Sequence, residues 1–213
     1  MSEVFLHERV SARIGTLHLD LMIALRAPWT VLFGPSGTGK STVLRHLAGL
    51  VGGGAWRRQM PLAAQQPALF PHRTVRQNLT FGWGGETNAV RFEELVALFR
   101  LEDLLERYPS QISGGQAQRV NVARALMPQR SKLVLLDEPF TGLELSFRNE
   151  LLLALRDWTR RNQLPVLMVT HEVADCLLLD AEVIKLHEGR VVAQGPACEV
   201  LAEERERLLA SLR

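Results

Sequence analysis

The amino-acid sequence predicts an α/β fold built on a mainly parallel sheet. Residues 132–136 (Lys-Leu-Val-Leu-Leu) and 165–169 (Pro-Val-Leu-Met-Val) are short runs that are apolar at almost every position. Such runs are typical of strands that are buried on both faces, as the strands of parallel sheets are. A third apolar run, residues 29–33, leads through a glycine-rich turn into a segment with helical spacing at residues 42–49. Strand, turn and helix in this order are the unit from which parallel sheets are built.

A single domain is expected over residues 1–213, because a chain of this length can form one core with a smaller lobe. Residues 71–127 have a predominantly helical pattern and separate two stretches of strand-and-helix pattern. We therefore expect an α/β core made of residues 1–70 and 128–213, with residues 71–127 inserted as an α-helical subdomain.

The composition limits the kinds of partner. Of all residues, 46% are hydrophobic and 23% are charged, and a formal net charge of +2 argues against nucleic acid as a partner. The two cysteines, Cys176 and Cys198, are far apart, which indicates a reducing compartment without a disulfide framework. Residues 1–4 lack the order of a signal peptide, and no apolar run approaches the ~20 residues that span a bilayer. We therefore expect any membrane contact to be peripheral and made through a partner protein.

The first elements are predicted as strands. Apolar and polar residues alternate over residues 17–23, which is the period of a half-buried strand, and we place strands at residues 4–10 and 14–25. Residues 51–55 are expected to form a flexible link, and Thr74 is expected to cap a helix. Further helices are expected at residues 90–99, 101–106, 114–127, 145–161, 173–179 and 198–212, and a hairpin at residues 181–187 and 190–193.

Residues 34–41, called the phosphate loop below, fit the pattern G-x-x-x-x-G-K-[ST]. Glycines let successive backbone N–H groups point at phosphate oxygens, and the helix that follows adds the partial positive charge of its N-terminus. Lys40 can reach the β- and γ-phosphates of a nucleoside triphosphate, and the Ser41 hydroxyl can bind Mg²⁺. The alternative is an ordinary glycine turn, which the flanking strand and helix disfavour. The residues expected to bind the nucleotide are Gly34, Pro35, Ser36, Gly37, Thr38, Gly39, Lys40, Ser41 and Thr42.

Three polar residues follow the two buried strands. Asp137 and Glu138 come directly after residues 132–136, and His171 comes after residues 165–169. Ligand chemistry in α/β folds gathers at the carboxyl ends of the strands, so these side chains are expected close to the phosphate loop. Asp137 can hold Mg²⁺ opposite Ser41, Glu138 can polarise an attacking water, and His171 can bond a γ-phosphate. The alternatives are two acids that cap a strand exit in solvent and a structural histidine.

Residues 113–116, Ser-Gly-Gly-Gln, precede another predicted helix and are called the Ser-Gly-Gly-Gln motif below. Glycines at a helix N-terminus can bind an anion, so the chain carries two phosphate-binding devices on different lobes. If each nucleotide needs both devices, they have to meet across a dimer. Taken alone, the motif is an N-cap with glycines.

Taken together, these motifs resemble the ATP-binding subunit of ATP-binding-cassette (ABC) transporters over nearly the whole chain. The phosphate loop looks like the family's Walker A motif, and residues 133–137 look like Walker B, followed by Glu138 as the catalytic glutamate. The Ser-Gly-Gly-Gln motif, with Ile112 before it, is similar to the family's Leu-Ser-Gly-Gly-Gln sequence, while Gln65 looks like the Q-loop glutamine and His171 like the switch histidine. The resemblance implies a P-loop NTPase core of the RecA-like type.

The resemblance also implies ligands and roles. ATP and Mg²⁺ are the implied ligands, with Lys40, Glu138 and His171 in catalysis and with Ser41, Gln65 and Asp137 around the metal. Gln65 is also implied to bind the nucleotide. The implied assembly is a head-to-tail homodimer in which each ATP lies between one subunit's phosphate loop and the other subunit's Ser113, Gly114, Gly115 and Gln116.

The same resemblance places the protein at a membrane. It implies an ATPase on the cytoplasmic face of the inner membrane that powers transport through a separate permease, which docks at a groove near residues 65–70. A substrate-binding protein is an expected member of the complex. The short length of the chain and residues 70–72 look most like importer subunits. Residues 78–82 look closest to molybdate-type oxyanion importers.

The chain departs from the family pattern at three places. The interval between Gly49 and Gln65 is short, so the antiparallel β part of the fold is expected to be reduced. No Tyr or Trp lies between Phe5 and Ile14, where relatives stack an aromatic ring on adenine, which leaves His7 or Arg9 as substitutes. Glu144 stands where the family usually has aspartate.

Two rival functions remain open. One is a non-transport ABC ATPase that acts in DNA repair or translation, although this chain has neither a long coiled-coil insert nor a second cassette. Binding to nucleic acid at physiological salt would favour that reading. The other is a regulatory module that holds ATP with little turnover, which an assay of ATP hydrolysis with and without Mg²⁺ would separate from an ATPase.

Overall fold

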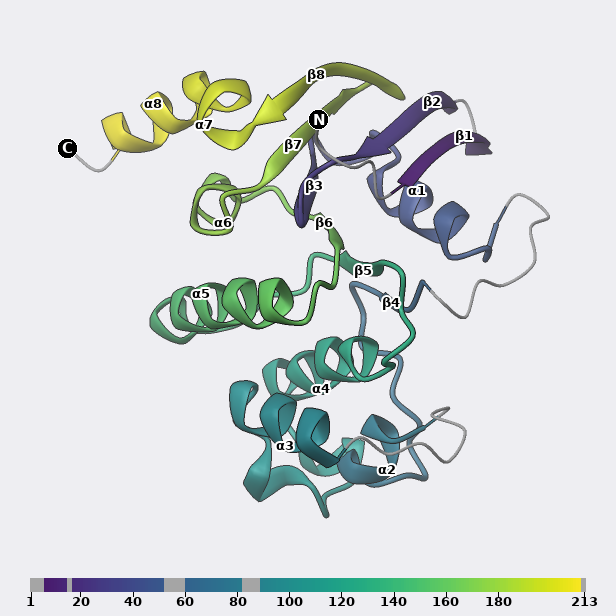
Figure 1. Ribbon diagram of the computed structural model, residues 1–213, viewed down its shortest axis with the longest axis vertical. Coiled ribbons are helices and arrows are strands. Elements are labelled where there is room, and N and C mark those ends of the chain that lie inside the picture. The colour runs from purple at the N-terminus through teal and green to yellow at the C-terminus, as the bar shows by residue number, and fades with distance from the viewer. Residues whose placement is uncertain (1–5, 15–16, 52–59, 82–88, 212–213) are drawn as a thin grey trace.

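A computed structural model describes residues 6–14, 17–51, 60–81 and 89–211. Residues 52–55 of the predicted link therefore lie outside the described part of the chain. The fold is the predicted α/β fold, with one mainly parallel sheet, a separate antiparallel pair of strands and helices on both faces of the sheet (Figure 1).

The main sheet has six strands in the order β4-β5-β6-β3-β7-β8. All neighbouring pairs are parallel except β7 and β8, which form the predicted antiparallel hairpin. Strands β3, β5 and β6 are buried at every position, as their continuous apolar sequences predict. The strand bounds are Trp29–Phe33 (β3), Leu62–Ala63 (β4), Val134–Asp137 (β5), Val166–Val169 (β6), Glu182–His187 (β7) and Arg190–Pro196 (β8).

A second sheet contains β1 (Leu6–Ile14) and β2 (Leu17–Leu25), which pair in antiparallel register from Leu6 with Leu25 to Ile14 with Leu17. The period-two prediction holds for β2, because Leu19 and Ile23 are fully buried while His18 and Asp20 are exposed. The predicted end of the first strand at residue 10 is wrong. Residues 11–13 continue β1, since they contain no strand-breaking glycine or proline and pair with residues 18–20 of β2.

The two faces of the main sheet are covered differently. One face carries α1 (Lys40–Leu47) and the β1–β2 pair, which share a hydrophobic cluster with Leu32, Leu135 and Leu167. The opposite face carries α4 (Gly114–Leu126), α5 (Leu145–Arg161) and α6 (Val173–Leu178), packed on the alternate side chains of the same strands. The phosphate loop and the Ser-Gly-Gly-Gln motif, at the starts of α1 and α4, thus belong to helices on opposite faces of the sheet.

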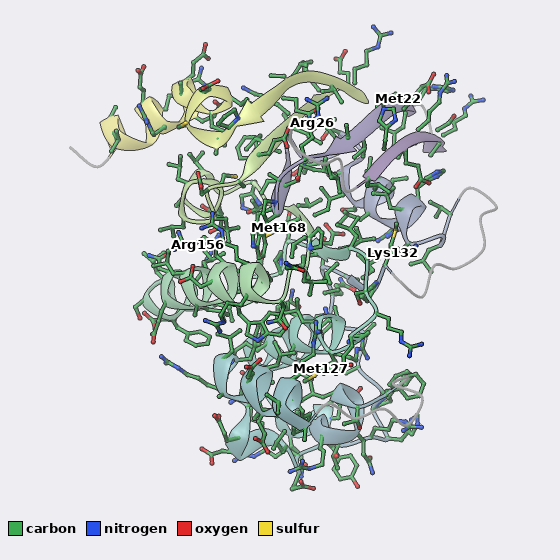
Figure 2. The ribbon with its side chains drawn as sticks, viewed as in Figure 1. Met22, Arg26, Met127, Lys132, Arg156 and Met168 are labelled. Carbon is green, nitrogen blue, oxygen red and sulfur yellow. The ribbon has the colours of Figure 1, made fainter. Side chains whose placement is uncertain are left out.

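Residues 71–127 contain helices and no strand in their described part, and they lie at the end of the molecule opposite β7 and β8 (Figure 1). Besides α4 they contain α2 (Val75–Leu79), α3 (Ala89–Leu98) and the 3-10 helices η1 (Glu102–Leu104) and η2 (Pro109–Gln111). Met127 of this part and Met168 of β6 belong to one continuous hydrophobic cluster, and Figure 2 shows both in the interior. The helical part therefore shares the core of the sheet.

Two predicted helices differ from the structure. Residues 101–106 form only the 3-10 turn η1, in which burial of both Leu101 and Leu104 suits a three-residue period. The C-terminal helix is divided into α7 (Ala197–Val200) and α8 (Ala202–Ser211), with the fully buried Leu201 at the break. Among the described residues, no helix is both long and apolar enough to cross a bilayer.

Candidate nucleotide site

The phosphate loop leaves the buried strand β3 in a conformation that requires glycine. Gly39 has φ +93° and caps α1, and a Cβ built on it would lie 2.7 Å from Leu19 Cδ2. A Cβ on Gly34 would collide with the carbonyl oxygen of Leu186 on the neighbouring strand β7. The loop is therefore held closely against two sheets, with the N-terminus of α1 pointing into it.

Lys40, the cation of the phosphate loop, is buried, with 7% of its surface exposed. Its ammonium group donates hydrogen bonds of 2.8 Å to the carbonyl oxygens of Gly34 and Pro35. Burial lowers the pKa of Lys40, and the nearby carboxylates of Glu138 and Asp137 oppose that change. The positive charge thus sits inside the loop, where a phosphate chain would need it.

Ser41 and Asp137 meet as the sequence predicts. The Ser41 hydroxyl donates to Asp137 Oδ1 over 3.0 Å, although the two residues are 96 positions apart. Asp137 is 3% exposed, and its burial raises the pKa of its carboxyl group against the opposing hydrogen bond from Ser41. A buried carboxylate beside a hydroxyl is a hard oxygen donor set that suits Mg²⁺, and a divalent cation would offset the cost of burying the charge.

Glu138 is contacted by two of the other predicted residues. Gln65 Nε2 donates to Glu138 Oε2 over 3.1 Å, and His171 Nδ1 lies 3.5 Å from Glu138 Oε1. Glu138 has φ +45°, an uncommon backbone conformation for a residue with a side chain, of a kind that gathers at functional sites. The structure therefore brings Gln65, Glu138 and His171 together, next to Asp137.

The Ser-Gly-Gly-Gln motif is arranged as a helix cap. Ser113 Oγ accepts from the Gln116 N–H over 3.2 Å, and Gln116 Oε1 accepts from the Ser113 N–H over 2.8 Å. A Cβ on Gly114 would meet no atom within 4 Å, so packing inside the described chain does not require glycine there. At Gly115, by contrast, a Cβ would lie 3.3 Å from the carbonyl oxygen of Gly142.

Two buried polar residues of α4, which the sequence analysis did not single out, connect that helix to the site. Asn121, 1% exposed, donates from Nδ2 to the carbonyl oxygen of Ala64 over 2.9 Å, directly before Gln65. Gln118, 4% exposed, reaches the carbonyl oxygen of Glu138 over 3.5 Å. A signal existed in the sequence, because both residues lie at helical spacing on the face of α4 that carries Val122 and Ala125.

Near residues 65–70, aromatic and cationic side chains gather. The rings of Phe70 and Phe81 are 4.3 Å apart, and the guanidinium of Arg73 lies 4.8 Å from the Phe81 ring centre. Phe81 is 47% exposed. Asn78 fixes the segment by bonding both the N–H and the carbonyl oxygen of Phe70.

Of the two residues considered for adenine, Arg9 already has a partner. Its Nε and Nη2 donate to the two carboxylate oxygens of Asp20, each over 2.7 Å, across the β1–β2 pair. His7 is exposed on the same strand.

Known proteins resemble this chain in sequence and in fold. A profile of the family described as "ABC transporter" matches residues 25–141, more than half of the chain. The "Molybdenum import ATP-binding protein ModC" of Rhodopseudomonas palustris (strain HaA2) is 38% identical over 216 residues, covering 90% of this chain and 57% of that protein. The protein of the same name from Pseudomonas aeruginosa is 38% identical over 210 residues, covering 87% and 58%.

A solved structure titled "Structure of ATP binding subunit of ABC transporter" matches with a TM-score of 0.76 and 25% identity, over 93% of this chain and 92% of that one. The chain spans 57% and 58% of the lengths of the two curated relatives.

Proposed function

Since the chain belongs to the ABC transporter family, we propose that it is the ATP-binding and ATP-hydrolysing subunit of a transporter. It powers the passage of a solute through a separate membrane permease. The observation that carries the proposal is the convergence of Ser41 with Asp137, and of Gln65 and His171 with Glu138, beside the phosphate loop. Residues 1–213 form one ABC ATPase domain, in which residues 71–127 are the helical subdomain.

In this proposal the phosphate loop and Lys40 bind the triphosphate of ATP. Lys40 exchanges the carbonyl oxygens of Gly34 and Pro35 for oxygens of the β- and γ-phosphates. Ser41, Asp137 and Gln65 would hold Mg²⁺, which when bound would neutralise charge on the phosphates. The donor set fits this ion, since Ser41 and Asp137 offer two oxygens that already lie 3.0 Å apart.

Glu138 is the general base that takes a proton from the attacking water, and His171 contacts the γ-phosphate. The Glu138 carboxylate is already aimed by Gln65 from one side and by His171 from the other. His171 has room to turn from Glu138 to the substrate, because its side chain is 59% exposed. In this proposal a base, a metal site and a phosphate sensor lie together at one edge of the sheet.

The second wall of the site comes from a partner copy in a head-to-tail homodimer. Residues Ser113, Gly114, Gly115 and Gln116 of that copy face the triphosphate. The open space at Gly114 supports this part of the proposal, because nothing within the described chain occupies it. The helix start behind it provides the positive end of a dipole for an anion.

The solute proposed is an oxyanion of the molybdate type, taken into the cell. The names of the two curated relatives and the resemblance of residues 78–82 support this choice. The permease docks near residues 65–70, where exposed Phe81 and the neighbouring Phe70 offer apolar surface, and a substrate-binding protein completes the complex. The subunit thereby lies on the cytoplasmic face of the inner membrane.

The test of hydrolysis is the variant Glu138→Gln. We expect Mg²⁺-dependent ATPase activity in the parent protein and a loss of about 100-fold or more in the variant, with ATP and a dimer retained. The matched control is Glu188→Gln, which makes the same change at another residue with positive φ, in the β7–β8 turn. Parent-rate hydrolysis by Glu138→Gln would show that Glu138 is not the base.

The transport part is tested by isolating the protein from membranes and identifying its companions. A permease that copurifies, and ATPase activity that molybdate stimulates in reconstituted vesicles, would support the proposal. Binding to nucleic acid at physiological salt with no permease would contradict it and favour the repair or translation reading.

A further inference from the structure

An ion pair between the partly buried Arg148 and the buried Asp175 lies directly beside the proposed catalytic residues. Arg148 Nη2 donates to Asp175 Oδ2 over 2.7 Å, and the two side chains are 15% and 3% exposed. Arg148 is in the first turn of α5 and Asp175 in the first turn of α6. These helices follow, respectively, the strands β5 and β6, which end at Asp137 and Val169.

The pair holds both neighbours of His171. Thr170 Oγ1 donates to Asp175 Oδ2 over 3.2 Å and accepts from the Glu172 N–H over 3.1 Å. Glu172 Oε1 also lies 3.7 Å from Arg148 Nη1. The backbone on each side of His171 is thus fixed to the ion pair, while the imidazole itself is left to face Glu138.

The ion pair also borders the space beside Glu138 and His171. A cavity of about 110 Å³ is lined by Arg148 and Asp175 together with Glu138 and His171. The loop from Glu138 to the start of α5 closes it, and the Arg148 N–H is bonded to the carbonyl oxygen of Glu144 at the end of that loop. A displacement of α5 relative to α6 would therefore change the distance between Glu138 and His171.

Stability alone does not account for such a pair. Moving each of the two charges out of water has a substantial free-energy cost. A well-packed apolar pair of similar volume is therefore often as stable or more stable. Burial indeed raises the pKa of Asp175, which means that its charge is held against a desolvation cost. What an apolar pair cannot reproduce is the hydrogen bond from Thr170 and the directed contact with Glu172.

We propose that Arg148 and Asp175 are positioning residues for ATP hydrolysis, which fix His171 against Glu138 by joining the first turns of α5 and α6. The inference rests on the proposed function, because it concerns the rate of the hydrolysis step. It requires no contact of either residue with ATP.

The experiment compares three variants with the parent protein: Arg148→Lys, Asp175→Asn and the double variant Arg148→Met/Asp175→Leu. Each variant is measured for kcat and KM of ATP hydrolysis and for Tm. Since misplacement of a catalytic group by about 1 Å can cost ~100-fold in rate, we expect kcat of the double variant to fall by about 10- to 100-fold. We expect KM to stay within about twofold, because the phosphate loop is untouched.

Stability separates positioning from folding. The single variant Asp175→Asn leaves the partly buried Arg148 with only Glu172, at 3.7 Å, as a counter-charge, so its Tm should fall most, while the apolar double variant should regain Tm. Arg148→Lys keeps the charge but loses the fork geometry, and it should retain more activity than the double variant. A double variant that regains kcat together with Tm would overturn the proposal.

The matched control is Lys185→Met/Glu204→Leu, which removes another partly buried ion pair of 2.7 Å between β7 and α8. It should change Tm and leave kcat at the parent value. A final comparison adds His171→Ala to each protein. In the parent it should lower kcat strongly, and in the Arg148→Met/Asp175→Leu protein only slightly further, because the histidine is already misplaced.

Fully additive losses would contradict the proposed connection to His171. If the parent protein itself fails to hydrolyse ATP with Mg²⁺, the proposed function fails and the positioning role falls with it. If the parent hydrolyses ATP and the double variant does so equally well, only the positioning role fails.

Discussion

The two proposed phosphate-binding devices of this protein begin with the same unit, a glycine turn before a helix, yet they relate differently to the rest of the chain. In the phosphate loop, the side chains that follow the glycines bond to distant or buried groups: Ser41 to Asp137 and Lys40 to the carbonyl oxygens of its own loop. In the Ser-Gly-Gly-Gln motif, Ser113 and Gln116 bond to each other's backbone as a capping box, and Gly114 faces open space.

The difference shows that only the phosphate loop has, from its own chain, side chains that suit a metal ion and a general base, namely Asp137 and Glu138. Asp137 and Glu138 reach the phosphate loop because β5 and β3 flank β6 in the same parallel sheet. The second device is fixed in shape by its cap but provides only backbone and small polar groups. In the proposed homodimer, a nucleotide site that uses both devices is divided between two copies, and variants can separate the contributions.

The largest effect is expected for Lys40→Ala. Removal of the buried ammonium should lower ATP affinity and abolish hydrolysis, with a loss of more than ~100-fold in kcat/KM, because no other cation lies within the loop. Calorimetric titration with ATP and a steady-state assay measure the two effects. The exposed Lys132 provides the matched control, and Lys132→Ala should behave as the parent.

The variant Gly114→Arg tests the contribution of the Ser-Gly-Gly-Gln motif to the nucleotide site that two copies are proposed to share. Because a Cβ at this position would meet no described atom within 4 Å, Tm and ATP binding should stay at the parent values. Dimer formation with ATP in the Glu138→Gln background should be lost, and hydrolysis should fall by about tenfold or more. Light scattering after gel filtration measures the dimer, and Val192→Arg, on exposed β8, serves as the control. An intact, active dimer of Gly114→Arg would refute the second wall.

A smaller effect is expected where α4 contacts the Gln65 segment. Asn121→Leu keeps the side-chain volume but removes the hydrogen bond to the Ala64 carbonyl oxygen, which should cost about 1–3 kcal/mol in the free energy of unfolding. We expect kcat to fall severalfold as Gln65 loses its support. Asn162→Leu removes a bond of the same length, from an exposed residue to the Trp158 carbonyl oxygen at the end of α5, and should lower stability less and leave kcat unchanged. Equal kcat in both variants would mean that Asn121 is structural only.

The smallest effect is expected for Asp137→Asn, which tests how much the buried carboxylate lowers the stability of the folded protein when no metal is bound. The folded-state pKa of Asp137 is raised by burial, so its ionised form destabilises the empty protein above that pKa, and the penalty disappears as pH falls below the unfolded value. Asp137→Asn should therefore raise the Tm of the nucleotide-free protein slightly at neutral pH, and the difference should shrink in acid. Thermal unfolding over a pH series without Mg²⁺ tests this, and a lowered Tm at neutral pH would contradict it.

Much of the fold was predictable because its signals are local. The apolar strands β3, β5 and β6, the alternation in β2 and the glycines of the phosphate loop all reflect constraints within about ten residues of chain. The prediction of an α-helix at residues 101–106 was wrong because tertiary packing decided the conformation there. Leu101 and Leu104 have helical spacing, yet their burial leaves only a 3-10 turn.

For the candidate site, the sequence determined which residue types stand at the ends of the strands and at the starts of α1 and α4, and hence the family. Only the tertiary structure decided which of them meet. Arg148 and Asp175 look in the sequence like ordinary polar positions on helices, while Gln118 and Asn121 are marked only by their place on the apolar face of α4. They contact the site only because α4, α5 and α6 pack on one face of the sheet and bring residues far apart in the chain within hydrogen-bond distance.

The phosphate loop and the Ser-Gly-Gly-Gln motif could each be recognised from eight residues or fewer, since backbone conformation there depends on glycine itself. That the first lies beside Asp137 and Glu138, while no described residue comes within 4 Å of a Cβ at Gly114 of the second, is a property of strand order and packing, which no local pattern encodes.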